Sequence, residues 1–68
     1  MIECVNVSSS NIRQICFDNN SIIVYFHSGG VYKYINVSKS VFDQFINSIS
    51  KGQFLDNVIK PNYDFVKL

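Results

Sequence analysis

The sequence has no long apolar run and no excess of charge of either sign, and each absence excludes a class of protein. The longest unbroken apolar run, residues 22–26, is far shorter than the roughly 20 residues of a membrane-spanning helix. No membrane span is therefore expected. Six basic residues stand against five acidic ones, whereas strong non-specific binders of nucleic acid carry a clear basic excess. The charge balance counts against that class.

Cysteine and histidine are also scarce, which limits the chemistry open to the chain. Cys4 and Cys16 allow one disulfide bond at most, and the first residues do not resemble a secretory leader. We therefore expect both thiols to be reduced and the protein to be cytoplasmic. The single histidine, His27, lies at an expected hairpin tip, and no pair of residues has the close spacing of metal ligands. No metal or other cofactor is expected.

Catalytic groups are missing as well. A cysteine and a histidine form a nucleophilic pair only with a third, orienting group and an oxyanion donor. The sequence has no motif for either, and the remaining candidate, Asp18, lies in an expected turn. We therefore expect no catalytic site and a protein that is not an enzyme.

The chain is short, and its 68 residues predict a single domain over residues 1–68 with a thin margin of stability. A domain of this size buries only about 60% of the surface that its unfolded chain exposes. Such domains often depend on a disulfide, a metal or oligomerisation. Four tyrosines and six phenylalanines are more aromatic residues than so small a core easily hides. Self-association or docking on a partner protein is therefore one hypothesis for its function.

Alternation of apolar residues predicts an antiparallel meander of three to four strands. The strongest strand places Ile22, Val24 and Phe26 on one face. Asn and Asp tolerate the left-handed backbone of tight reversals, so residues 18–21 predict the turn before that strand. Strands are expected at residues 2–7, 12–17, 22–27 and 31–34.

The position of Lys33 predicts the register of the last hairpin. With a two-residue loop Lys33 would lie on the apolar face beside Val24, because changing the loop length by one residue exchanges the two faces. A three-residue loop, residues 27–29 with Gly29 in the left-handed bulge position, instead places Tyr32 and Tyr34 on that face. We therefore predict the three-residue loop, with both tyrosines largely in the core.

Apolar residues at helical spacing predict two helices after the strands. The first is capped by Ser38 or Ser40 and covers the sheet with an apolar stripe that ends at Ile49. A second, shorter helix is expected to stop before Pro61, followed by an irregular tail. The predicted fold class is α+β: a small antiparallel meander packed against a C-terminal helix and a second short helix.

With these elements in order, the chain resembles the KTSC domain family, a short module named for the C-terminus of some lysyl-tRNA synthetases and also found as free-standing small proteins. Residues 7–12 resemble the family's opening, and Tyr32-Lys33-Tyr34 matches its central Tyr-x-Tyr motif. Residues 50–54 match its Ser-x-Gly-x-Phe motif. The chain departs at Phe17, where Tyr is common, and at Ser38, where Pro is common. The resemblance implies a non-enzymatic module for which RNA binding has been suggested.

Aromatic and basic residues interleave around the hairpin and supply the candidate binding site. Aromatic faces can stack on bases and cations can contact phosphate, so we expect RNA or a nucleotide as ligand. The structural alternative assigns Tyr32 and Tyr34 to the core, which leaves the outward face as the better surface. The candidate residues are Arg13, Tyr25, His27, Tyr32, Lys33, Tyr34 and Lys39.

Two other functions remain open. The first is a protein-interaction module, which includes a phage or mobile-element product that inhibits a host factor, or a homo-oligomer that captures a nucleotide between its subunits. A purely structural appendage fits the neutral charge equally well.

Overall fold

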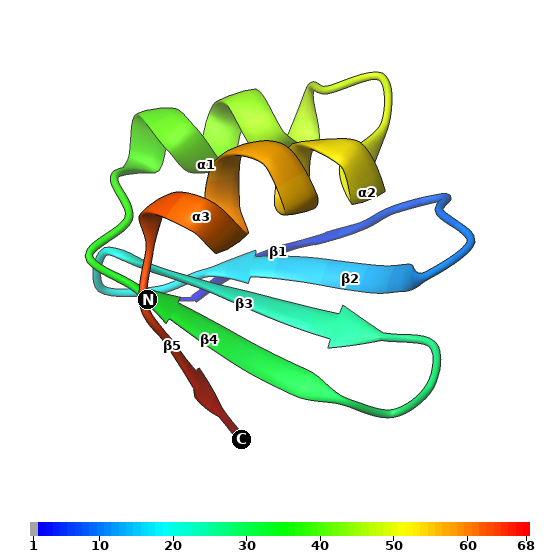
Figure 1. Cartoon of the computed structure of the whole chain (residues 1–68), viewed down its shortest axis with the longest axis horizontal. Helices are drawn as coiled ribbons and strands as arrows, with labels where there is room; N and C mark the ends of the chain where they lie inside the picture. Colours follow the sequence, from blue (N-terminus) through cyan, green and yellow to red (C-terminus); the bar gives the residue numbers. More distant parts are fainter. Residues whose placement is uncertain (1) are drawn as a thin grey trace.

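The computed structural model describes residues 2–68 and contains a five-stranded antiparallel sheet with its helices on one face (Figure 1). The strands lie side by side in the order in which they occur in the sequence. The first four form a meander, and the last adds to its edge after the helices. The predicted α+β fold is confirmed. The strands are β1 (Glu3–Asn6), β2 (Ile12–Phe17), β3 (Ser21–Phe26), β4 (Val31–Ile35) and β5 (Phe65–Lys67).

The helical layer consists of one separate helix and one continuous helical segment. Helix α1 (Lys39–Ile46) begins after Ser38, whose hydroxyl accepts a hydrogen bond from the Val41 N–H at 3.3 Å. The segment that follows is made of α2 (Lys51–Phe54), the π-helical turn η1 (Leu55–Ile59) and α3 (Lys60–Asn62). Ser38 is thus the cap, one of the two residues that the sequence predicted.

Two predictions about the helices are wrong. Ile49 does not extend the apolar stripe, because α1 ends at Ile46 and Ile49 lies fully exposed in the following loop. The second helix also continues through Pro61. Proline breaks an α-helix because it lacks an N–H and its ring meets the carbonyl four residues earlier. Here the preceding turn is π-helical, with the Lys60 N–H bonded to the Leu55 carbonyl, so the hydrogen-bond spacing changes before the proline.

The β3–β4 hairpin has the register that Lys33 predicted. The Gly29 N–H bonds to the Phe26 carbonyl at 3.0 Å, and Gly29 has a φ of 100°, a conformation open to glycine. The loop is therefore three residues long. Tyr34 lies opposite Ile22 and Tyr32 opposite Val24, on the face that the helices cover, which we call the inner face.

The tail that was expected to be irregular instead forms β5. Phe65 pairs with Tyr34, and Lys67 pairs with Tyr32. The pairing continues the inner face of the sheet by one more strand. Because strand residues alternate between faces, Phe65 and Lys67 join the two tyrosines there.

The core lies between the inner face and the helices. Phe42 and Phe45 of α1 and Leu55 and Ile59 of η1 pack down onto the strands. Val37 joins them from the loop before α1. The strand residues that meet them are Ile12, Ile15, Ile22, Val24 and Tyr34.

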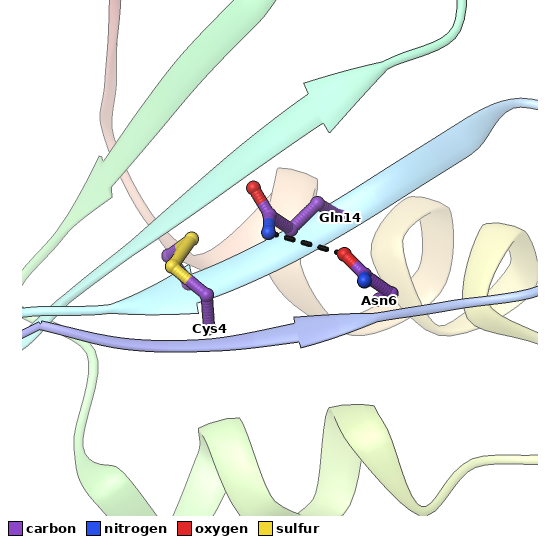
Figure 2. The surroundings of a disulfide bond; sticks show 4 residues. Cys4, Asn6 and Gln14 are labelled. Atoms are coloured by element: carbon purple, nitrogen blue, oxygen red, sulfur yellow. Dashed lines mark hydrogen bonds between the residues drawn. A yellow bond between two sulfur atoms is a disulfide. The ribbon is translucent and has the colours of Figure 1, made fainter.

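The prediction of reduced thiols is wrong: Cys4 and Cys16 form a disulfide (Figure 2). The β1–β2 register places the two residues directly opposite each other, a relation that spacing in the sequence did not reveal. The bond lies on the face away from the helices, which we call the outer face. Beside it, the Gln14 side-chain amide donates to the Asn6 side chain at 3.1 Å.

Substitution of Tyr34 and Lys33 tests the register. Tyr34→Ala should lower the free energy of unfolding by about 3 to 5 kcal/mol, because it empties a buried aromatic site. Lys33→Ala, one residue away on the outer face, should change it by no more than about 0.5 kcal/mol. Urea unfolding measures both values. Equal stability of the two variants would contradict the register.

The disulfide should be a main source of stability for so small a domain. It closes a loop with a sequence separation of 12, for which loss of chain entropy in the unfolded state predicts about 2 to 3 kcal/mol. A reductant should therefore lower the melting temperature of the parent protein. The matched control is Cys4→Ala/Cys16→Ala, whose melting temperature should not respond to the reductant. A parent protein indifferent to the reductant would refute the prediction.

Candidate functional site

A pocket of about 690 Å³ opens on the inner face of the sheet, over β4 and β5. This volume lies in the usual range for ligand sites, roughly 300 to 1,000 Å³. Two lysines, the hairpin loop and four aromatic residues line it. The aromatic residues are Phe26, Tyr32, Tyr34 and Phe65, and the loop contributes Ser28 and Gly30.

The aromatic rings touch one another in a chain across three strands. Tyr32 packs edge-on against Phe26, with ring centroids 5.6 Å apart. The centroid of its ring also lies 5.3 Å from that of Phe65. Phe65 also contacts Tyr34 at 5.8 Å. The burial of the rings differs: Tyr34 is 2% exposed and Phe65 is 55% exposed. Phe65 therefore presents aromatic surface to a ligand, while Tyr34 anchors the wall to the core.

Two lysines supply the charge of the pocket. Lys67 comes from β5, and Lys60 comes from α3. The Lys60 ammonium lies 3.0 Å from Asp56 Oδ1, one helical turn earlier. The hydrogen bond that the Lys60 ammonium donates to Asp56, together with the negative charge of Asp56, raises the pKa of Lys60 above its ordinary value. The charged form of Lys60 is therefore favoured, and Asp56 orients its side chain.

Tyr34 adds a hydroxyl group to the residues that line the pocket. The Tyr34 side chain is buried. Within residues 2–68 no buried side-chain oxygen or nitrogen lacks a hydrogen-bond partner, so the Tyr34 hydroxyl is not left buried and unpaired. Burial raises the pKa of the Tyr34 hydroxyl, and the charge of Lys60 opposes this rise. The phenol is thus neutral at physiological pH and offers both a donor and an acceptor.

Three predicted site residues lie on the outer face, away from the pocket. Arg13 occupies a β-bulge in β2, and its guanidinium lies over the Tyr25 ring, 5.7 Å from the centroid. Lys33 pairs with Ile23, further across the same face. The structure thus brings Arg13 and Tyr25 together.

The other predicted residues are dispersed. Tyr32 and Tyr34 line the pocket. His27 lies at the hairpin tip, where its Nε2 lies 3.0 Å from the Ser9 carbonyl oxygen. Because a carbonyl only accepts, Nε2 is the protonated nitrogen. The Lys39 ammonium lies 3.1 Å from Glu3 Oε1, and the hydrogen bond that it donates to Glu3 is the main cause of its raised pKa. Lys39 therefore tethers β1 to α1.

Of the eight residues that line the pocket, the sequence predicted only Tyr32 and Tyr34 as site residues. Lys60, Phe65 and Lys67 lie close to the end of the chain, remote in sequence from the Tyr-x-Tyr motif. Alternation of Phe65 and Lys67 about Val66 was the signal for a strand, but three residues are too few to recognise one.

Residues 2–68 have neither a membrane-spanning helix nor a cluster of metal ligands. No helix there is long and apolar enough to span a membrane. No three His, Cys, Asp or Glu side chains in the same residues lie close enough together to bind a metal ion.

Comparison with known proteins points to one family. The family model described as KTSC domain matches residues 8–63. A crystal structure of a KTSC domain protein from Yersinia pestis is 33% identical, with a TM-score of 0.92, and the match covers 100% of this chain and 99% of that one. A lysine–tRNA ligase from Nostoc punctiforme is 34% identical over 61 residues, which is 87% of this chain and 11% of the ligase. The chain therefore spans only a small part of that relative.

Alkaline titration tests the environment of Tyr34. Because burial raises its pKa above the ordinary value of 10.0, the Tyr34 phenol should ionise only above that pH. The stability that comes from its neutral form is present below about pH 10 and is lost as the pH rises through the raised pKa. Phenolate absorbance of the parent protein and of Tyr34→Phe measures this. The variant should lose absorbance change from the part of the curve above pH 10.0, and a loss confined to lower pH would contradict the assignment.

Proposed function

The chain belongs to the KTSC domain family, and from this membership and the lining of the pocket we propose that it is a small, non-enzymatic module that binds single-stranded RNA. A base lies against the exposed aromatic surface of Phe65 and Tyr32. The ammonium groups of Lys60 and Lys67 contact phosphate. The observation that carries the proposal is the meeting of aromatic rings and two cations in one pocket.

The chemistry of the pocket favours a ligand that is both flat and anionic. Stacking of a base on an aromatic side chain contributes about 1 to 3 kcal/mol and accepts any base. Lysine acts on phosphate as a mobile point charge. A nucleotide unit combines both features, whereas a purely apolar ligand would leave the lysines unused.

The relatives support RNA as the class of ligand. One relative is named as a lysine–tRNA ligase, an enzyme whose substrate is an RNA. The matched segment is 11% of that enzyme, so its catalytic activity is not carried over to this chain. What the relationship supports is a module that works beside RNA.

The nearly neutral charge implies modest, pocket-centred binding. With a net charge of +1, the chain has little long-range attraction for nucleic acid. Two phosphate contacts on a single strand predict a slope of about −1.4 in log K against log salt concentration. Strongly basic binders show much steeper slopes.

A second candidate function is protein interaction through the outer face of the sheet. Within residues 2–68 no helix covers this face (Figure 1). The apolar residues that lie on it by register are Ile23, Val31, Ile35 and Val66. Arg13 and Lys33 are charged residues of the same face, and the one acidic strand residue, Glu3, pairs with Phe17 on the inner face. This arrangement favours an acidic partner protein over a second copy.

Titration of a fluorescently labelled oligouridine tests the RNA proposal. The parent protein should bind at micromolar concentration and moderate salt. Phe65→Leu should weaken binding by about 1 to 3 kcal/mol, because it removes the stacking surface. Lys67→Gln should weaken it and make the salt slope shallower by about 0.7.

Lys33→Gln is the matched control, because it removes an equal charge from the outer face. Its affinity should equal that of the parent protein. If Lys33→Gln loses affinity and Lys67→Gln does not, the outer face is the binding surface. Absence of any binding by the parent protein would refute an RNA-binding function.

A further inference from the structure

A second, smaller hollow adjoins the pocket at the tip of the β3–β4 hairpin. Its volume is about 390 Å³. Phe26 and Ser28 line both cavities, so the two hollows meet at these residues. The remaining lining of the second hollow comes from Ser10, Asn11 and His27.

Hydrogen bonds hold the walls of this second hollow together. The His27 N–H donates to the Asn11 carbonyl at 2.9 Å, and the His27 ring donates to the Ser9 carbonyl at 3.0 Å. The Ser9 hydroxyl in turn accepts from the N–H groups of Asn11 and Ile12 at 3.3 and 3.4 Å. The β1–β2 connection is thereby fastened to the hairpin tip. The hollow is a preformed feature of the fold.

The chemistry of the second hollow differs from that of the pocket. It has one aromatic ring, Phe26, and the polar groups of Ser10, Asn11, His27 and Ser28. None of these is a lysine, arginine or carboxylate. Because Nε2 is bonded to Ser9, Nδ1 is the nitrogen of the His27 ring that is left for a ligand. The hollow therefore suits an uncharged group that carries donors and acceptors, such as a base edge or a ribose.

We infer that this hollow is a second subsite, which takes the nucleotide next to the one bound in the pocket. The inference rests on the proposed function. The bound RNA passes across Phe26 and Ser28, which line both cavities. Adjacent nucleotides therefore occupy adjacent hollows. The pocket binds a base and phosphate, and the second hollow binds the neighbouring base or ribose by hydrogen bonds. The binding unit is therefore a dinucleotide.

Calorimetric titration with 5′-phosphorylated uridine oligomers of increasing length tests this subsite. Affinity should rise about tenfold from the mononucleotide to the dinucleotide, as expected for one further base contact. In Ser10→Ala/Asn11→Ala this gain should disappear while affinity for the mononucleotide is unchanged. These two side chains are exposed at a loop, and a melting temperature close to that of the parent protein confirms that the variant is folded.

Lys67→Gln is the matched control in the pocket. It should weaken binding of the mononucleotide and the dinucleotide by the same factor. If the parent protein binds the mononucleotide and the dinucleotide equally, the second subsite is refuted and the proposed function stands. If the double variant loses mononucleotide affinity, the hollow is no separate subsite. If no oligomer binds, both proposals are refuted.

Discussion

The three-residue β3–β4 loop is the constraint on which the rest of the structure depends. Gly29 adopts a backbone conformation that favours glycine, and the loop length then decides which face each residue of β4 occupies. In this register Tyr34 enters the core and Lys33 faces outward. A loop of two residues would bury the lysine and expose both tyrosines. The length of this loop therefore decides the composition of both the core and the pocket.

The C-terminal residues complete the pocket whose first wall is the β3–β4 hairpin. After the helices cover the sheet, β5 returns to the free edge of β4 and sets Phe65 and Lys67 beside the two tyrosines. The helical segment reaches Lys60 through a π turn that precedes Pro61. Such turns recur at functional sites, and here the residue that follows the turn, Lys60, lines the pocket. A continuous pocket is thus assembled from segments that lie far apart in the sequence.

The opposite edge of the sheet is secured differently. Strand β1 is short and largely exposed, so burial alone holds it weakly. The disulfide to β2 and the ion pair between Glu3 and Lys39 fasten it to the sheet and to α1. Figure 2 shows the disulfide beside the hydrogen bond that joins Asn6 and Gln14 across the same two strands. Covalent and polar links therefore hold this edge of the sheet, whereas contacts between aromatic rings hold the opposite edge.

By itself the sequence determined the meander, the turns and the hairpin register. These depend on local chemistry: alternation of apolar residues, Asn and Gly in the turns, and the cost of burying Lys33. The tertiary structure decided the rest. Cys4 meets Cys16, and Phe65 meets Tyr34, only because strands pair across many residues. Pro61 stays helical because a π turn precedes it, and no local sequence pattern predicts that turn. A site built from such pairings becomes visible only when the chain is folded, because contacts between distant residues leave no period in the sequence.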